Sequence, residues 1–149
     1  MPRNIDRRSQ CPISYVLDIF GDKWTLLVIR DLLIFGKRTY GEISSSDEKI
    51  ATNILADRLA VLEQEGIIIK EKDKEKGSRF IYSITQKGVD LLPVIIEMIR
   101  WSATYDTDTK VPPQMIEKVK NERDAFIKEI LDALANNEYL ISGMLSRPA

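Results

Sequence analysis

Few side chains in this sequence are suited to covalent or metal chemistry. Its 149 residues include no histidine and one cysteine, Cys11. Zinc sites of the usual Cys/His kind therefore cannot form within one chain, and nucleophile pairs that need a histidine base are excluded by the same counts. The sequence also has no glycine-rich loop of the phosphate-binding kind, so its carboxylates are interpreted as surface charge. We expect no metal, no cofactor and no enzymatic activity.

Cys11 is the residue most suited to redox chemistry. It precedes Pro12, which is favoured at the first position of a helix, and Arg7 and Arg8 are close in the sequence. A helix N-terminus and nearby positive charge both stabilise the thiolate, which is the reactive form of cysteine. Two interpretations remain open, a redox-sensing thiol and a buried structural thiol. A disulfide could form only with another subunit or with a small thiol.

Recognition of DNA is the other chemistry that the residue pattern indicates. Helical spacing from 51 to 65 places Leu55, Leu59 and Leu62 on one narrow arc, with Ile54 and Arg58 at its edge. The opposite face carries small or polar groups, namely Asn53, Ala56, Asp57, Ala60 and Gln64. Such a face can approach base edges closely in the major groove.

Each candidate on this helix has a distinct expected role. Asn53 can pair with adenine, Thr52 can reach a base or a phosphate, and Ala56 leaves room for close approach. Arg58 can reach a phosphate from the helix edge. Asp57 is unusual because its carboxylate repels phosphate. It could act only by accepting from cytosine or by orienting Asn53.

A β-hairpin is predicted after this helix. The strands are expected at 67–69 and 79–84, with a turn signal at Gly77-Ser78. Residues 70–76 read KEKDKEK, so in an extended chain the four lysines share one face. The candidates for contact with the DNA backbone or minor groove are Lys72, Lys74, Lys76 and Arg79. Taken alone, such a hairpin is more often a solvated loop.

The remaining elements are helical. We expect helices at 13–20 and 22–35, ended by Gly21 and Gly36, and a short one at 39–45. Thr85 is expected to cap a long helix from 86 to 106 with a kink or local break at Pro93. Beyond the Val111-Pro112-Pro113 linker, residues 115–135 predict one more helix, and the last dozen residues a loosely held tail.

Apolar residues surround nearly the whole circumference of the predicted 86–106 helix. A small domain cannot easily cover such a helix alone, so we expect it to be covered on more than one side. The fold class is mainly α with a small hairpin, in the arrangement of a winged helix-turn-helix.

An ordered set of motifs resembles the HxlR-type winged-helix transcriptional regulators. They are CP at 11–12, GDKWTLL at 21–27, ILADRL at 54–59, EGI at 65–67 and YSITQKG at 82–88. The resemblance implies a homodimeric DNA-binding repressor or activator, with the N-terminal helix and the helix after the wing as N- and C-terminal dimerisation helices. The residues that it places at this dimer contact are Ile13, Val16, Leu17, Leu92, Ile95, Ile99 and Trp101. It also implies that a cysteine in the place of Cys11 can sense oxidants or electrophiles. The expected partners are double-stranded DNA, a second copy and an oxidant or small-molecule effector.

The net charge of the chain and its expected division into two parts bear on these expectations. The net charge of −1 means that DNA binding must come from local patches, and residues 1–87 carry the slight basic excess. The near-neutral charge and Asp57 also leave open an alternative, a winged-helix protein-interaction module without DNA binding. We expect a division into a DNA-binding and dimerisation unit at 1–110 and a helical extension at 111–149. Without a signal peptide or membrane span in the pattern, the expected location is cytoplasmic.

Overall fold

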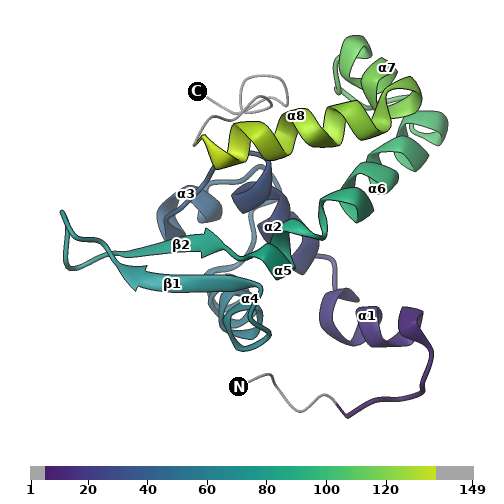
Figure 1. Ribbon diagram of the computed structural model, residues 1–149. Helices are drawn as coiled ribbons and strands as arrows, with labels where there is room; N and C mark the ends of the chain where they lie inside the picture. Colours follow the sequence, from purple (N-terminus) through teal and green to yellow (C-terminus); the bar gives the residue numbers. More distant parts are fainter. Residues whose placement is uncertain (1–5, 137–149) are drawn as a thin grey trace.

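The computed structural model describes residues 6–136 (Figure 1). Their elements follow in the order α1 (Pro12–Phe20), α2 (Thr25–Leu33), α3 (Tyr40–Ser44), α4 (Thr52–Gln64), β1 (Ile68–Lys72), β2 (Phe80–Ile84), α5 (Gln86–Val89), α6 (Leu92–Tyr105), α7 (Pro113–Asn121) and α8 (Arg123–Ala135). The predicted fold class is confirmed. The C-terminal tail of the sequence prediction lies outside the described residues.

One hydrophobic core joins these elements around α2. Ile29 and Leu32 of α2 are fully buried, and the same core takes in the apolar arc of α4 and the inner side of α6. Phe126 and Ile130 of α8 belong to it as well, so the described part of the C-terminal extension is packed onto the rest of the chain. Within residues 6–136, every helix is too short or too polar to cross a lipid bilayer.

The starts of α2 and α3 are each fixed by a local polar group. The Asp22 carboxylate accepts from the backbone N–H groups of Trp24 and Thr25 at 2.9 and 3.0 Å, at the entry to α2. Thr39 and Glu42 form a capping box on α3, each side chain accepting from the other's backbone N–H. These contacts satisfy amides that the helices leave free.

The hairpin is antiparallel, with Lys70 opposite Tyr82 and Lys72 opposite Phe80. Its base is buried through Ile68 and Tyr82. The predicted single row of four lysines is wrong, because the extended strand ends at Lys72. From there the Asp73 carboxylate accepts from the backbone N–H of Glu75 and from Arg79, which turns the chain before Lys74 and Lys76 can continue the row.

The predicted long helix after the hairpin is interrupted, as expected near Pro93. It is divided into α5 and α6, with the break at Asp90 and Leu91. The break was expected at Pro93 itself, but it falls just before this residue, so that Pro93 lies in the first turn of α6, where its missing N–H costs nothing. Thr85 caps α5 as predicted, its hydroxyl accepting from the backbone N–H of Gly88.

The single helix predicted at 115–135 is also divided. α7 ends at Asn121 and α8 begins at Arg123, with Glu122 between them in a non-helical conformation (φ −132°, ψ 37°). Figure 1 shows the two helices meeting at an angle beside α6. Met115 and Val119 of α7 are buried in the shared core, so packing against α6 determines the break.

Candidate nucleic-acid interface

The outward face of α4 is free of covering elements among the described residues. Leu55, Leu59 and Leu62 are buried, which confirms the predicted apolar arc. The opposite face is exposed, namely Thr52, Asn53, Ala56, Asp57, Ala60 and Gln64. A helix 13 residues long is about 20 Å in length at 1.5 Å per residue, enough to follow a major groove.

The turn before α4 adds features that the sequence analysis did not single out. Lys49 is exposed and has a positive φ of 54°, two residues before the N-cap Ala51. Ala51 has no side chain that could accept from the first N–H groups of α4, so these donors remain available to an external acceptor. The Tyr40 hydroxyl donates to the Thr52 carbonyl at 2.8 Å and joins α3 to α4. The position of Lys49 beside the start of α4 could not be predicted, because a single lysine in a turn forms no sequence pattern.

Arg58 is less free than the sequence suggested. Its guanidinium lies 3.5 Å from the Asp22 carboxylate and 3.6 Å from the Asp57 carboxylate. Burial works to raise the pKa of Asp22, but hydrogen bonds from Thr25 and Trp24 and the charge of Arg58 outweigh it, so that pKa is lowered. Arg58 therefore ties α4 to the start of α2, and Asp57 is partly neutralised.

The hairpin presents cations beside α4. Lys70 and Lys72 alternate with Glu71 along β1 and share the face that Phe80 and Tyr82 occupy on β2. The Lys70 ammonium lies 4.2 Å from the centre of the Phe80 ring, which orients a lysine that was not among the predicted candidates. Lys72, Lys74 and Lys76 are exposed.

Arg79 is oriented by a carboxylate at the base of the hairpin tip. Its guanidinium lies 2.6 Å from Asp73, while part of the side chain stays exposed. The pKa of Asp73 is lowered, first by the backbone N–H of Glu75 and then by Arg79. Arg79 therefore shares its charge with Asp73 and offers a phosphate less than a free arginine would.

The Cys11 thiol is exposed at the N-cap position of α1. Its pKa is lowered, chiefly by the nearby backbone N–H of Ser14 and to a lesser extent by that of Ile13. The two nearby arginines are engaged elsewhere, because Arg8 pairs with Asp18 at 2.6 Å and Arg7 lies over the Tyr15 ring. The interpretation as a buried thiol is wrong, and the helix N-terminus is what favours the thiolate.

Helices α1 and α6 lie away from the tip of the hairpin (Figure 1). Each carries a stripe of exposed apolar side chains. On α1 the exposed apolar residues are Ile13, which is 70% exposed, Val16 and Leu17. On α6 the exposed residues are Val94, Met98, Trp101 and Tyr105, spaced as one helical face.

Two residues expected at the dimer contact lie elsewhere. Leu92 and Ile95 are 0% and 6% exposed, inside the core of the single chain. They cannot offer surface to a partner because the inner side of α6 packs on the body of the protein. Ile99 is partly buried against the same core.

A short helix, a turn, an exposed second helix and a two-stranded wing define the class of protein, a winged helix-turn-helix domain. The chain belongs to the HxlR-like helix-turn-helix family, whose model matches residues 19–110. The family resemblance read from the sequence motifs is confirmed.

Individual relatives agree with this family. The chain is 36% identical over 95 residues to the uncharacterized HTH-type transcriptional regulator YdeP of Bacillus subtilis (strain 168), covering 64% of this chain and 73% of YdeP. The crystal structure of PA1607 is similar to this chain with a TM-score of 0.62 and 32% sequence identity. The match covers 69% of this chain and 72% of PA1607. The redox regulator HypR in its oxidized form has a TM-score of 0.56 and 29% identity, covering 66% of this chain and all of that one.

Family and relatives together support a DNA-binding transcriptional regulator, as predicted from the sequence. The alternative of a protein-interaction module finds no support among them.

Proposed function

We propose that this regulator binds a pseudo-palindromic operator as a homodimer, with α4 in the major groove and the hairpin along the flanking backbone. The outward face of α4 carries the proposal, because it combines base-reading Asn53 with small Ala56 and nothing described covers it. In this arrangement Asn53 and Thr52 read base edges, while Asp57 orients its neighbours or accepts from cytosine.

Affinity would come from cations at the two ends of this face. Lys49 and the free N–H groups of α4 are suited to one phosphate, and the hairpin lysines to the next backbone segment. Because α4 itself adds the negative charge of Asp57 and Glu63 to its exposed side, these flanking cations carry the phosphate contacts. The near-neutral whole chain is then compatible with a local basic surface.

The second copy would pair through the stripes on α1 and α6. The exposed part of the predicted set is Ile13, Val16, Leu17 and Trp101, and Val94, Met98 and Tyr105 extend it. Burying contiguous apolar surface of this kind favours association at about 25 cal/mol per Å². Two subunits related by a two-fold axis would place their α4 helices about 34 Å apart, one turn of DNA. We assign pairing and DNA binding to residues 1–110 and treat 111–149 as a C-terminal addition, whose described part is α7 and α8.

Oxidant or electrophile control through Cys11 completes the proposal. The thiol is exposed, its pKa is lowered, and it precedes the helix expected to pair the subunits. A modification there would alter the α1 contact and with it the spacing of the two reading helices. The comparison of operator affinity before and after quinone treatment, with Cys11→Ser alongside, tests this part.

Selection of bound sequences from random double-stranded DNA with the purified full chain tests the proposed function. We expect an inverted repeat with half-site centres one helical turn apart, and binding that falls steeply with salt. Asn53→Ala should change the selected bases, whereas Asn121→Ala on α7 should not. Absence of any enriched sequence, or an unchanged preference in Asn53→Ala, would contradict the docking arrangement.

A further inference from the structure

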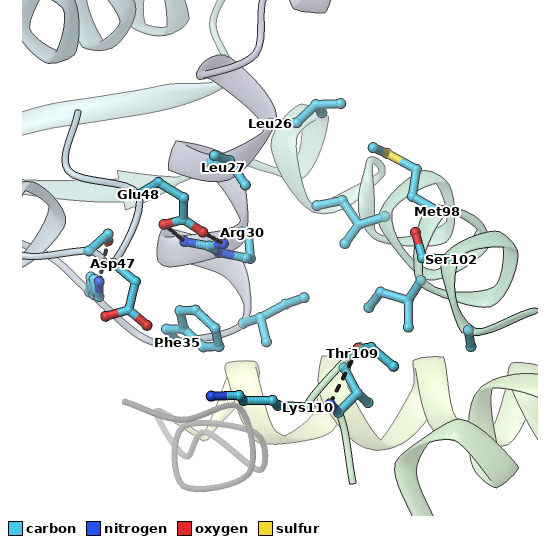
Figure 2. A pocket seen from close by; sticks show the side chains of 17 residues that line it. Leu26, Leu27, Arg30, Phe35, Asp47, Glu48, Met98, Ser102, Thr109 and Lys110 are labelled. Carbon is cyan, nitrogen blue, oxygen red and sulfur yellow. Dashed lines mark hydrogen bonds and ion pairs between the residues drawn. The ribbon is translucent and has the colours of Figure 1, made fainter. Parts of the chain in front are cut away.

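A pocket of about 390 Å³ opens between α2, the turn before α4, α6 and the segment leading to α7 (Figure 2). Its walls are mostly apolar, formed by Leu27 and Phe35 on the α2 side and by Ile95 and Ile99 on the α6 side. A volume of this order suits a small organic molecule. The DNA-reading face of α4 lies outside it.

One side of the pocket carries a carboxylate-binding group. Figure 2 shows Arg30 and Glu48 together at this side, with Met98 and Ser102 of α6 across from them. The Arg30 guanidinium donates to both Glu48 oxygens, at 2.5 and 3.1 Å. This is the forked geometry by which arginine recognises carboxylates. Glu48 therefore shows where a carboxylate fits.

Glu48 is the more solvent-accessible partner of this pair. Its side chain is 35% exposed and extends from a surface turn, whereas Arg30 is 20% exposed and anchored from behind by Asp31 at 2.8 Å. An incoming carboxylate could bind Arg30 while Glu48 turns into water. The forked contact with Arg30 and the burial of the apolar body of a ligand would together decide the affinity.

We propose that this pocket binds a small, largely apolar acid whose carboxylate replaces Glu48 on Arg30. Its body lies between Phe35 and Ile99, and Lys110 lies at the rim.

The position of Glu48 links this site to DNA binding, a link that rests on the proposed function. Glu48 lies in the turn between α3 and α4, three residues before the N-cap Ala51. Ser46, in the same turn, stays fixed by Asp31 and Lys37. Release of Glu48 therefore loosens the α4 side of the turn. An acid in the pocket would alter operator affinity through the first residues of α4.

Calorimetric titration of the full chain with 2-naphthoate and with the neutral 2-naphthamide tests the site without DNA. Naphthoate should bind at least about tenfold more tightly than the amide, because only the acid can use the Arg30 fork. Glu48→Gln should tighten naphthoate binding roughly fivefold, since it removes the competing anion and keeps the shape. Loss of a merely structural contact would not strengthen binding.

A substitution that fills the pocket with a larger side chain provides a second test of the proposed ligand site. Ala103→Phe, on the α6 wall, should abolish naphthoate binding, and Ala125→Phe on the exposed side of α8 is the matched control. Equal binding of acid and amide, unchanged binding in Ala103→Phe, or no binding of naphthoate would each overturn the inference. Binding of naphthoate by a chain that selects no DNA would instead leave this site intact and refute the proposed function.

Discussion

The Arg30 guanidinium in α2 donates to both carboxylate oxygens of Glu48, eighteen residues further along the chain. Glu48 belongs to the turn that leads into α4, so this pair ties the reading helix to the central helix of the core. A second tie lies beneath it, where the buried Asp31 carboxylate contacts Ser46 of the same turn and Lys37. The position of α4 thus depends on polar contacts as well as on its apolar arc.

The Arg30 and Glu48 pair should make stability depend on pH. The hydrogen bond from Arg30 lowers the pKa of Glu48 in the folded chain. Its contribution is therefore present above the unfolded pKa and is lost as pH falls through the folded pKa. Glu48→Gln should lower the free energy of unfolding by up to about 1 kcal/mol at pH 7 and by less near pH 3, below the unfolded pKa.

Urea denaturation of both chains at the two pH values measures this difference. Glu71→Gln, at an exposed carboxylate of β1, is the matched control and should change little at either pH. A Glu48→Gln effect of equal size at both pH values would show that charge is not its cause.

The buried Asp31 and Lys37 should behave as a coupled pair. Asp31 is 2% and Lys37 6% exposed, so either charge left alone inside the core is costly. Asp31→Leu should destabilise the protein by about 3 kcal/mol or more, because it leaves Lys37 uncompensated. The double variant with Lys37→Met should cost less than the sum of the single changes, by about 1 kcal/mol or more. Strict additivity in urea denaturation would contradict the coupling.

Lys72 should contribute to DNA binding without selecting sequence. Lys72→Ala should weaken binding to operator and to unrelated DNA alike, and reduce the slope of log K against log salt by about 1. Fluorescence anisotropy titrations over a range of salt concentrations measure both quantities. Lys120→Ala, an exposed lysine of α7, should leave the slope unchanged.

Pairing through α1 should be sensitive to charge at Leu17. This residue is 52% exposed on the apolar stripe. Leu17→Glu should shift the chain from dimer to monomer in sedimentation velocity, because a carboxylate would be buried without a partner. Ala125→Glu on α8 serves as the control. Dimers that persist in Leu17→Glu would place the contact elsewhere.

The reactivity of Cys11 should follow its helix position. Because the backbone N–H groups of Ser14 and Ile13 lower the thiol pKa, more thiolate is present at neutral pH in the folded chain than in the unfolded one. The pH midpoint of iodoacetamide alkylation should therefore rise when urea unfolds α1. Equal midpoints in both states would remove the basis for selective sensing.

Short-range patterns predicted the DNA-proximal half of the fold well. The buried arc of α4 repeats with the helical period and buries one face, so sequence alone places it. The apolar β-branched runs located the hairpin strands, although β1 extends to Lys72, beyond the predicted 67–69. Gly66, where φ is 72°, and Thr85 mark boundaries by residue type.

Some sequence predictions were wrong because contacts between distant segments determine where helices end and which of their residues are buried. Glu122 carries no helix-breaking signal, yet packing of α7 and α8 on α6 interrupts the helix there. Leu92 and Ile95 look like interface residues until those helices are in place. The pocket around Arg30 draws its lining from four separate segments, so no local pattern could indicate it.

The two tryptophans occupy contrasting surroundings. Trp24 is partly buried against the core with the Lys23 ammonium 4.8 Å from its ring centre. Trp101 is 67% exposed and lies 5.0 Å from the Tyr105 ring on the outer side of α6. The intrinsic tryptophan fluorescence of the protein can consequently report dimer formation. Emission from Trp101 should move to shorter wavelength when two subunits meet, while Trp24 supplies a steady internal standard.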